Sequence, residues 1–335
     1  EVAGVAASGE IALALLPTLR PDVILMDVFL PGIDGVETTI RIMRTQPTPI
    51  VVTSAALSRA SLTISMDALR AGALTVIEKP LDIRRPDHPK LARQLCTQIT
   101  IMSQVQVIRQ REARPDTLRR TVTSAAPLLS RTVPGLSIAD PVAAGGYRIL
   151  GLVASTGGPN ALARVLSDVP TDFPLPIVLV QHIGAEFAAG FAAWLDTQVS
   201  MPVEMATHGE RVRPGRVYVA PGGRHLTIKG NSMVLTDEPP VSGQRPSGTV
   251  LFQSLADHFG AAGIGVLLTG MGDDGAQGLL AMRLAGACTL AEDETTAVIY
   301  GMPAVAAEIG AVQMKLPLDA IGARILNTVR TQRPA

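Results

Sequence analysis

Polar residues that follow three apolar runs of the sequence could together hydrolyse an ester or an amide. Ser155 lies in Ile149–Asn160 (ILGLVASTGGPN), between an apolar run and a helix-like segment. His182 comes after IVLV, and Asp273 and Asp274 come after GVLL. A serine at the carboxyl end of a buried strand, facing a helix N-terminus, is where an α/β sheet places a nucleophile. The set has the composition of a Ser-His-Asp hydrolase.

Each of these residues also has an interpretation other than hydrolysis. Glycine-rich turns after strands bind phosphates in other proteins, although neither GxGxxG nor GxxxxGK[ST] occurs around Ser155. His182 alone is compatible with a hydrogen-bonded structural histidine, and Asp273 and Asp274 are compatible with caps of a helix over Ala276–Leu284. Spacing alone does not decide which aspartate would orient the imidazole. The glycines of the serine turn leave room for backbone N–H groups to approach an oxyanion, which is compatible with hydrolysis.

A second polar set occurs in the N-terminal part of the chain. Asp27 ends VILMD, Ser54 ends IVVTS, and Lys79 lies in VIEKP. A carboxylate at the edge of a sheet can accept a phosphoryl group, and that group then needs a hydroxyl and a cation to hold its oxygens. Taken singly, each residue is better explained by a structural role, with Asp27 as a helix cap, Ser54 as a turn former and Lys79 as a surface charge.

The elements that must position these residues alternate between strands and helices, which predicts βαβ units and parallel sheets. Residues 1–85 and 147–330 form two such α/β regions, and residues 86–146 between them hold a helix over Leu91–Arg111 and an aperiodic linker. Arg211–Leu235, with its Pro-Gly and Gly-Gly turns, predicts an inserted antiparallel hairpin. In the first region we expect helices at Ser8–Leu19, Gly35–Arg44 and Ala60–Ala71, and strands at Val23–Met26, Ile50–Thr53 and Leu74–Ile77.

Composition narrows the class of protein further. The 335 residues suffice for two cores, and 47% hydrophobic with only 3% aromatic residues predicts aliphatic cores. A net charge of +0 gives no electrostatic reason to expect nucleic acid or an anionic membrane as a partner. Cys96 and Cys288 lack metal-ligand spacing and suit a reducing compartment. No apolar run approaches the ~18 residues of a membrane span and no signal peptide opens the chain, so a cytoplasmic location is expected.

PDVILMDVFLPGIDG, Ser54 and the Lys79-Pro80 pair resemble a response-regulator receiver domain over residues 1–85. The resemblance implies Asp27 as phospho-acceptor, Ser54 and Lys79 as switch and phosphate contacts, and Mg²⁺ as a cofactor bound by Asp27. Receivers open with a strand and an acidic pair that holds the Mg²⁺, and neither occurs here, so this metal site is expected to be incomplete.

The first ten residues, EVAGVAASGE, look like the second strand and following helix of a receiver. We therefore expect a flavodoxin-like receiver that lacks its first strand, truncated at the N-terminus by a unit of roughly 30 residues. The first strand would be the central one in the order 2-1-3-4-5. Without it, backbone groups go unpaired, and we expect this half to fold poorly as a receiver.

Motifs in the second region resemble the catalytic domain of the chemotaxis protein-glutamate methylesterase family (CheB), from Arg148 to Ile325. They are GLVASTGGP, LVQH, PGRVYVAPGGRHL, RPS…VLFQSLA, LTGMGDDGAQGLLAM and YGMP. The resemblance implies a doubly wound, mostly parallel α/β domain with a β-hairpin insertion, preceded by a receiver and a linker. Both halves of the chain thus point to the same family.

The resemblance also assigns roles. It implies Ser155 as nucleophile, His182 as general base and Asp274 as the acid that orients the base. Thr156 and Met271 would line the site and hold the oxyanion. The esterase itself would need no cofactor.

Several positions fall outside these roles or depart from the family pattern. Asp273 stands where the family commonly has Asn and is expected to be non-catalytic, and a structural role is expected for His225, which could lie near the site. His208 and His258 lie outside the triad pattern. The departures are Ile183-Gly184 in place of Met-Pro, Gln244 and Thr249 in place of His and Asp, and Glu292 where Gln is commoner. No triad member is lost, so an active enzyme is expected.

The function implied is demethylation of glutamate methyl esters on methyl-accepting chemotaxis receptors, with glutamine deamidation as a second activity. A chemotaxis histidine kinase would phosphorylate Asp27, and the unphosphorylated receiver would cover the catalytic cleft. A truncated receiver predicts constitutive esterase activity. Two other classes stay open, namely a non-catalytic signalling adaptor and a hydrolase of another ester.

Overall fold

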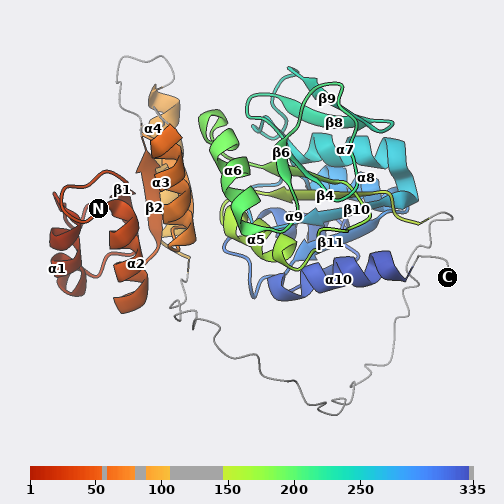
Figure 1. Cartoon of the computed structure of the whole chain (residues 1–335). Coiled ribbons are helices and arrows are strands. Elements are labelled where there is room, and N and C mark those ends of the chain that lie inside the picture. Colours follow the sequence, from red (N-terminus) through yellow and green to blue (C-terminus); the bar gives the residue numbers. More distant parts are fainter. Residues whose placement is uncertain (55–58, 80–87, 106–145, 332–335) are drawn as a thin grey trace, which may run out of the picture.

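A computed structural model describes residues 1–54, 59–79, 88–105 and 146–331 (Figure 1). The elements form two α/β units, each built on a parallel sheet, and a separate two-stranded hairpin. None of the helices in these ranges combines the length and the apolar character needed to cross a membrane. The expected α/β class is therefore confirmed for both halves of the chain.

The N-terminal unit has a parallel sheet in the order β1-β2-β3. Its strands and helices are α1 (Gly9–Leu19), β1 (Ile24–Asp27), α2 (Gly35–Thr45), β2 (Ile50–Ser54), α3 (Arg59–Arg70), β3 (Thr75–Glu78) and α4 (His88–Met102). Each of the six elements predicted in this region is present within a residue or two. Ser8 caps α1 as predicted, because its Oγ accepts the backbone N–H of Ile11 at 3.3 Å.

Two expectations for this unit are wrong. Residues 1–6 form no strand, because a strand needs a hydrogen-bonded neighbour and the described chain offers none there. The helix predicted over Leu91–Arg111 ends at Met102. Gln104 and Val105 make short-range bonds to the carbonyls of Ile101 and Met102, the tightened turn that ends many helices. The rest of that prediction and nearly all of the predicted linker lie outside the described residues. Poor folding of this half stays a prediction.

The C-terminal unit is a seven-stranded parallel sheet in the order β12-β11-β10-β4-β5-β7-β6. The strands are β4 (Ile149–Ala154), β5 (Ile177–Gln181), β6 (Val203–Met205), β7 (Val217–Val219), β10 (Gly263–Leu267), β11 (Cys288–Glu292) and β12 (Met314–Leu316). The strand order reverses between β4 and β10, and such a switch point is where ligands bind in open α/β sheets.

Helices cover both faces of this sheet (Figure 1). One face packs with α5 (Gly158–Ser167), α6 (Ala188–Gln198) and α10 (Leu318–Arg330). The other packs with α7 (Gly248–Phe259), α8 (Ala276–Leu284) and α9 (Met302–Glu308). The central strands are buried throughout, which explains their continuous apolar runs. A hairpin is present, as β8 (His225–Lys229) paired antiparallel with β9 (Ser232–Thr236) above α7. Its predicted extent of Arg211–Leu235 is wrong, because Val217–Val219 pairs with β5 and β6 as strand β7 of the main sheet.

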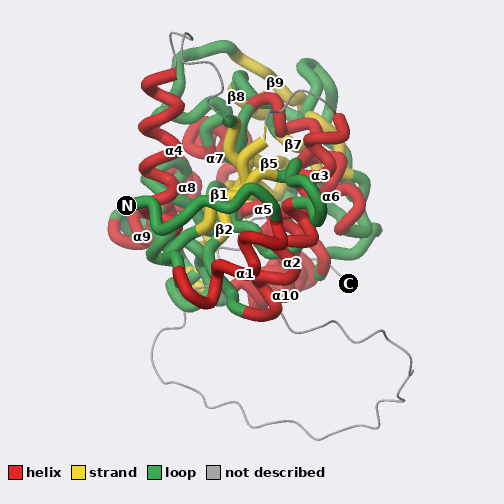
Figure 2. Tube along the Cα trace, turned by 90° about the vertical axis from the view of Figure 1, so that its left-hand side faces the viewer, coloured by secondary structure: helices red, strands yellow, loops and turns green. Residues whose placement is uncertain are grey.

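The two units touch through α3 and α6, which lie side by side in both views (Figures 1 and 2). Hydrogen bonds between described residues cross this contact. Asn160 Nδ2 donates to the carbonyl of Leu69 at 3.0 Å, and Arg70 donates to Thr197 Oγ1 at 3.4 Å. Another joins two backbone groups, the N–H of Gly157 and the carbonyl of Leu74, at 3.3 Å. The N-terminal unit thus contacts the turn that carries Ser155.

Candidate functional site

Ser155, His182 and Asp274 come together at one edge of the C-terminal sheet. Ser155 directly follows β4, His182 directly follows β5, and Asp274 lies in the loop between β10 and α8. These three strands are neighbours, with β4 between β10 and β5. The prediction that the strand ends gather a serine, a histidine and a carboxylate is therefore confirmed in its geometry.

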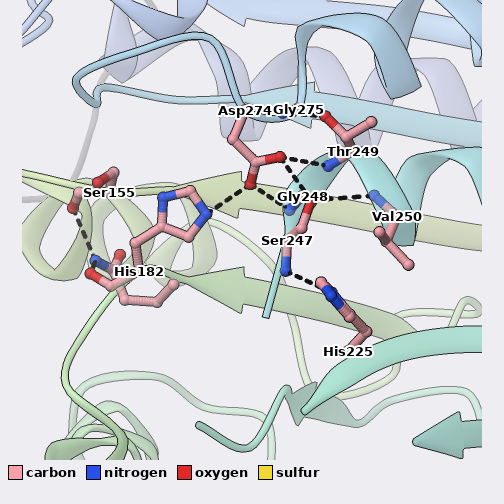
Figure 3. A network of polar contacts seen from close by, with 10 residues as sticks. Ser155, His182, His225, Ser247, Gly248, Thr249, Val250, Asp274 and Gly275 are labelled. Atoms are coloured by element: carbon pink, nitrogen blue, oxygen red, sulfur yellow. Dashed lines mark hydrogen bonds and ion pairs between the residues drawn. The ribbon is translucent and has the colours of Figure 1, made fainter. Parts of the chain in front are cut away.

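The imidazole of His182 lies between Ser155 and Asp274 (Figure 3). Its Nε2 is 2.8 Å from Asp274 Oδ2, and both side chains are almost fully buried, at 5% and 3% exposure. Its other nitrogen, Nδ1, is buried without a hydrogen-bond partner among the described residues and faces the Ser155 side. Because the Nε2–H donates its hydrogen bond to Asp274, the lone pair that can accept the proton of Ser155 is on Nδ1.

Asp274 is held by the N-terminus of α7. Its Oδ1 accepts from Ser247 Oγ at 2.6 Å and from the Thr249 N–H at 3.1 Å, and its Oδ2 accepts from the Gly248 N–H at 2.6 Å. Burial acts to raise the pKa of Asp274, but the hydrogen bond and charge of His182, with Ser247 and Gly248, outweigh it and lower the pKa from 3.8 to about 2. Asp274 is therefore a carboxylate at neutral pH.

The turn that carries Ser155 is fixed by residues from both neighbouring strands. Gln181 donates from Nε2 to the carbonyls of Ser155 and His182 at 2.7 and 2.9 Å, and so ties the two loops together. The N–H of Ser155 donates to the carbonyl of Thr269 at 3.0 Å. Gly157 has φ +79, and a Cβ there would lie 2.6 Å from Val298, so the turn requires glycine.

The backbone N–H groups of Thr156 and Met271 make no hydrogen bond to protein within the part of the chain that the structure describes. Thr156 is 5% exposed, and its carbonyl accepts from Thr269 Oγ1 at 2.9 Å. Met271 is 36% exposed, on the loop before Asp274. Thr156 directly follows Ser155. Met271 follows Gly270, where an added Cβ would lie 2.6 Å from the Cβ of Ser155. Both donors therefore lie near the serine, as an oxyanion site requires.

The remaining polar candidates lie apart from this cluster or support it. Asp273 is exposed, and its carbonyl accepts from Ala276 at the start of α8. His208 is exposed and accepts from the Leu235 N–H, and His258 is exposed near the end of α7. His225 is fully buried and contacts the backbone of Ser247.

The departures from the family pattern have distinct surroundings. Thr249 Oγ1 accepts from the Gly275 N–H at 2.8 Å, so it fixes the loop next to Asp274. Gly184 begins a 3₁₀ turn (Ala185–Phe187), where a Cβ would lie 2.2 Å from Glu186. Glu292 ends β11 with no exposed surface and accepts from the Thr269 N–H at 2.9 Å.

Gln181, Ser247 and Thr269 support the site although their roles were not predicted from the sequence. Ser247 carried a usable signal, because a serine directly before an apolar helix is a common N-cap, and here it does accept from Val250. Gln181 and Thr269 lie within motifs that were recognised, but their contacts depend on how neighbouring strands are aligned.

A second cluster forms at the carboxyl edge of the N-terminal sheet, where β1, β2 and β3 end beside one another. Asp27 Oδ1 accepts from the Phe29 N–H at 3.2 Å, and Oδ2 pairs with Lys79 Nζ. Ser54 is fully buried at the end of β2, and its Oγ has no partner among the described residues. The side chains of Asp27 and Lys79 are thus in contact, and Ser54 ends the strand between them, while the roles of the three residues stay predictions.

The residues present do not make a complete Mg²⁺ site. Asp27 is a carboxylate suited to Mg²⁺, but one of its oxygens is engaged by Lys79. Within the described ranges, no group of three or more His, Cys, Asp or Glu side chains is placed to hold a metal ion. Receiver domains in general are phosphorylated with Mg²⁺, and the residues described here do not supply the full set of ligands for that ion.

The fold and these two clusters define a two-unit α/β protein in which a receiver-like sheet precedes a sheet with the side chains of a serine hydrolase. Residues 150–325 match the family model of the CheB methylesterase, and residues 1–86 match that of the response regulator receiver domain. The chain belongs to the CheB methylesterase family.

Similar proteins cover nearly the whole chain. Protein-glutamate methylesterase/protein-glutamine glutaminase 2 of Paramagnetospirillum magneticum is 46% identical over 97% of this chain and 89% of its own length. A relative from Nitrosospira multiformis with the same activities in its name is 40% identical over 98% and 89%. The crystal structure of the Thermotoga maritima CheB methylesterase catalytic domain is 34% identical, covers 55% of this chain and 100% of that chain, and has a TM-score of 0.53.

Proposed function

We propose that this chain hydrolyses glutamate methyl esters on methyl-accepting chemotaxis receptors, and deamidates glutamine, under control of its receiver domain. The observation that carries the proposal is the buried pair of His182 and Asp274 beside Ser155 on three adjacent strands. The named activities of the relatives support the substrate class. The matched ranges support a division into a receiver (1–85), a connecting region (86–146) and a catalytic domain (147–330).

The mechanism is a two-step acyl transfer. Ser155 Oγ gives its proton to His182 Nδ1 and attacks the γ-carbonyl, while the Thr156 and Met271 N–H groups hold the oxyanion. The bond between the γ-carbon and the methoxy oxygen breaks, and the imidazolium gives its proton to the leaving methoxide, which departs as methanol. Water then attacks the acyl-enzyme with His182 as base, which frees the glutamate and restores Ser155. Asp274 keeps the imidazole oriented and stabilises its charged form.

Deamidation follows the same path, with ammonia in place of methanol as the leaving group. The glutamyl side chain is small, so it supplies little of the recognition. We therefore propose that the rim of the site contacts the surface of the receptor helices around the modified residue.

The proposed regulation uses the contact between the two units. Gly157 and Asn160, both on the segment that follows Ser155, donate to the carbonyls of Leu74 and Leu69 of the receiver. A receiver seated there restricts access of a receptor helix to Ser155. A chemotaxis histidine kinase is the proposed phosphodonor to Asp27. A phosphoryl group on Asp27 would compete with the Asp27 carboxylate oxygen for Lys79, and so shift the equilibrium of the contact between the receiver and the catalytic domain.

The test is methanol release from methyl-labelled receptor membranes. Ser155→Ala should abolish release, while Ser167→Ala, a matched change of an exposed serine at the end of α5, should leave it unchanged. No release from the folded wild-type chain would favour the signalling adaptor instead. Hydrolysis of p-nitrophenyl esters without release from receptors would favour a hydrolase of another ester.

A further inference from the structure

His225 is a buried histidine whose two ring nitrogens both contact backbone groups. It begins β8 and has no exposed surface. Nδ1 accepts from the N–H of Ser247 at 3.2 Å, and Nε2 is 3.1 Å from the carbonyl of Pro239. An N–H can only donate and a carbonyl can only accept, so the ring is neutral with its proton on Nε2. His225 therefore fixes the backbone of Ser247 from within the core.

Ser247 transmits this position to the catalytic cluster. Its Oγ donates to Asp274 Oδ1 at 2.6 Å, and the same oxygen accepts from the Val250 N–H at 3.3 Å as the cap of α7. Asp274 in turn holds His182 Nε2 at 2.8 Å. Figure 3 shows the contacts as one connected path, from His225 through Ser247 and Asp274 to the imidazole beside Ser155.

We propose that His225 is a positioning residue for the esterase reaction, acting through Ser247 and Asp274 on the orientation of His182. The inference rests on the proposed function for its substrate, but only on the geometry for its mechanism. Without His225, Asp274 keeps the N–H groups of Gly248 and Thr249, so the carboxylate stays bound to the N-terminus of α7 but loses part of what fixes its orientation. The Ser247 N–H loses its acceptor, and the hydroxyl that sets the tilt of the carboxylate is free to shift.

The expected effect is on kcat and not on KM. A displacement of about 1 Å in a catalytic group can lower the rate about 100-fold, because the reacting atoms leave their productive geometry. His225→Leu should therefore lower kcat by about 10- to 100-fold with KM changed less than about twofold. His225→Asn should recover most of the loss, because the Asn carbonyl lies close to the position of Nδ1 and can accept the same N–H.

His208 supplies a matched control. Like His225, His208 accepts a backbone N–H at its Nδ1, but the donor is Leu235 of the hairpin, at 3.1 Å. Leu235 is not part of the path of contacts from Ser247 to Asp274. His208→Leu should leave kcat unchanged. Unfolding of each full-length variant is followed by the fluorescence of Trp194, the single tryptophan, which lies buried on α6.

Two readouts separate this proposal from the proposed function. The first is methanol release from methylated receptor membranes, and the second is the rate at which Ser155 displaces fluoride from a fluorophosphonate probe, which needs an activated serine but no receptor. Slower labelling in His225→Leu, with recovery in His225→Asn, supports the proposal even if receptors release no methanol. The proposal is overturned if His225→Leu labels at the wild-type rate, if both His225 variants lose rate and thermal stability in parallel, or if wild-type Ser155 does not label at all.

Discussion

Replacing Glu292 by Gln should stabilise the catalytic domain at alkaline pH. Glu292 has no exposed surface, and its Oε1 has no partner among the described residues, while Oε2 accepts from the Thr269 N–H. Burial, opposed by that N–H and reinforced by the charge of Asp293, raises the pKa of Glu292 from 4.5 to about 7. The folded protein therefore binds this proton more tightly than the unfolded chain does.

The sign and size of the effect follow from proton linkage. Below pH 4.5 Glu292 is neutral in both states, and stability is unaffected. Between 4.5 and about 7 only the unfolded state ionises, so the free energy of unfolding falls by about 1.4 kcal/mol per pH unit. Above a pH of about 7 the loss is complete, at about 3 kcal/mol. The glutamine side chain of the Glu292→Gln variant keeps the shape and the carbonyl acceptor but cannot ionise, so the variant escapes this loss.

The assay is urea and thermal unfolding of the full chain at about pH 5 and about pH 8, on either side of most of this titration, followed by Trp194 fluorescence. The gain of Glu292→Gln over wild type should grow by about 2.5 kcal/mol between the two pH values, or about 5–10 °C in Tm for a domain of this size. Glu294→Gln is the matched control, because Glu294 is 59% exposed and pairs with Lys315 at 3.9 Å. A stability difference that is the same at both pH values refutes the reasoning.

Three further predictions concern the neighbouring contacts. The pKa of Asp274 falls from 3.8 to about 2 on folding, so its carboxylate stabilises the fold by about 2 kcal/mol above about pH 4. This stabilisation is lost as the pH falls towards 2. Asp274→Asn should therefore abolish the fall in the free energy of unfolding on the acid side, measured by urea unfolding, and an unchanged fall contradicts the prediction. Thr249→Ala leaves the Gly275 N–H without its acceptor and should cost about 1–3 kcal/mol in the same measurement, so a smaller loss would mean that water replaces the hydroxyl. Asn160→Ala removes the donor to the receiver and should raise methanol release without a phosphodonor several-fold, whereas release at the wild-type level would show that this bond does not hold the receiver in place.

The sequence predicts the position of a residue well where the ends of parallel strands alone determine that position. Three apolar runs of parallel-sheet character place Ser155, His182 and Asp274 at one sheet edge, because parallel strands end on the same side. The same physical reason brings Asp27 and Lys79 together.

Prediction fails where the position of a side chain depends on a second element far along the chain. His225 reaches Ser247 only because the hairpin packs over α7, and nothing in the local pattern of either residue shows that. The ring nitrogen of His182 that binds Asp274 is set by the loop after β10. The sequence shows Glu292 where the family commonly has Gln, but its complete burial follows from its place at the end of a strand between β10 and β12.

The hydrogen bond between the Gly157 N–H and the Leu74 carbonyl involves no side chain on either domain. Any residue at position 74 supplies the same carbonyl, whereas position 157 must stay glycine, because its φ of +79 and the nearby Val298 leave no room for a Cβ. On the receiver side, a substitution of Leu74 changes the packing around this bond but leaves its acceptor in place. On the catalytic side, the bond depends on the same glycine that shapes the Ser155 turn. The residue that lets the chain turn after Ser155 is thus also the residue through which the catalytic unit contacts the receiver.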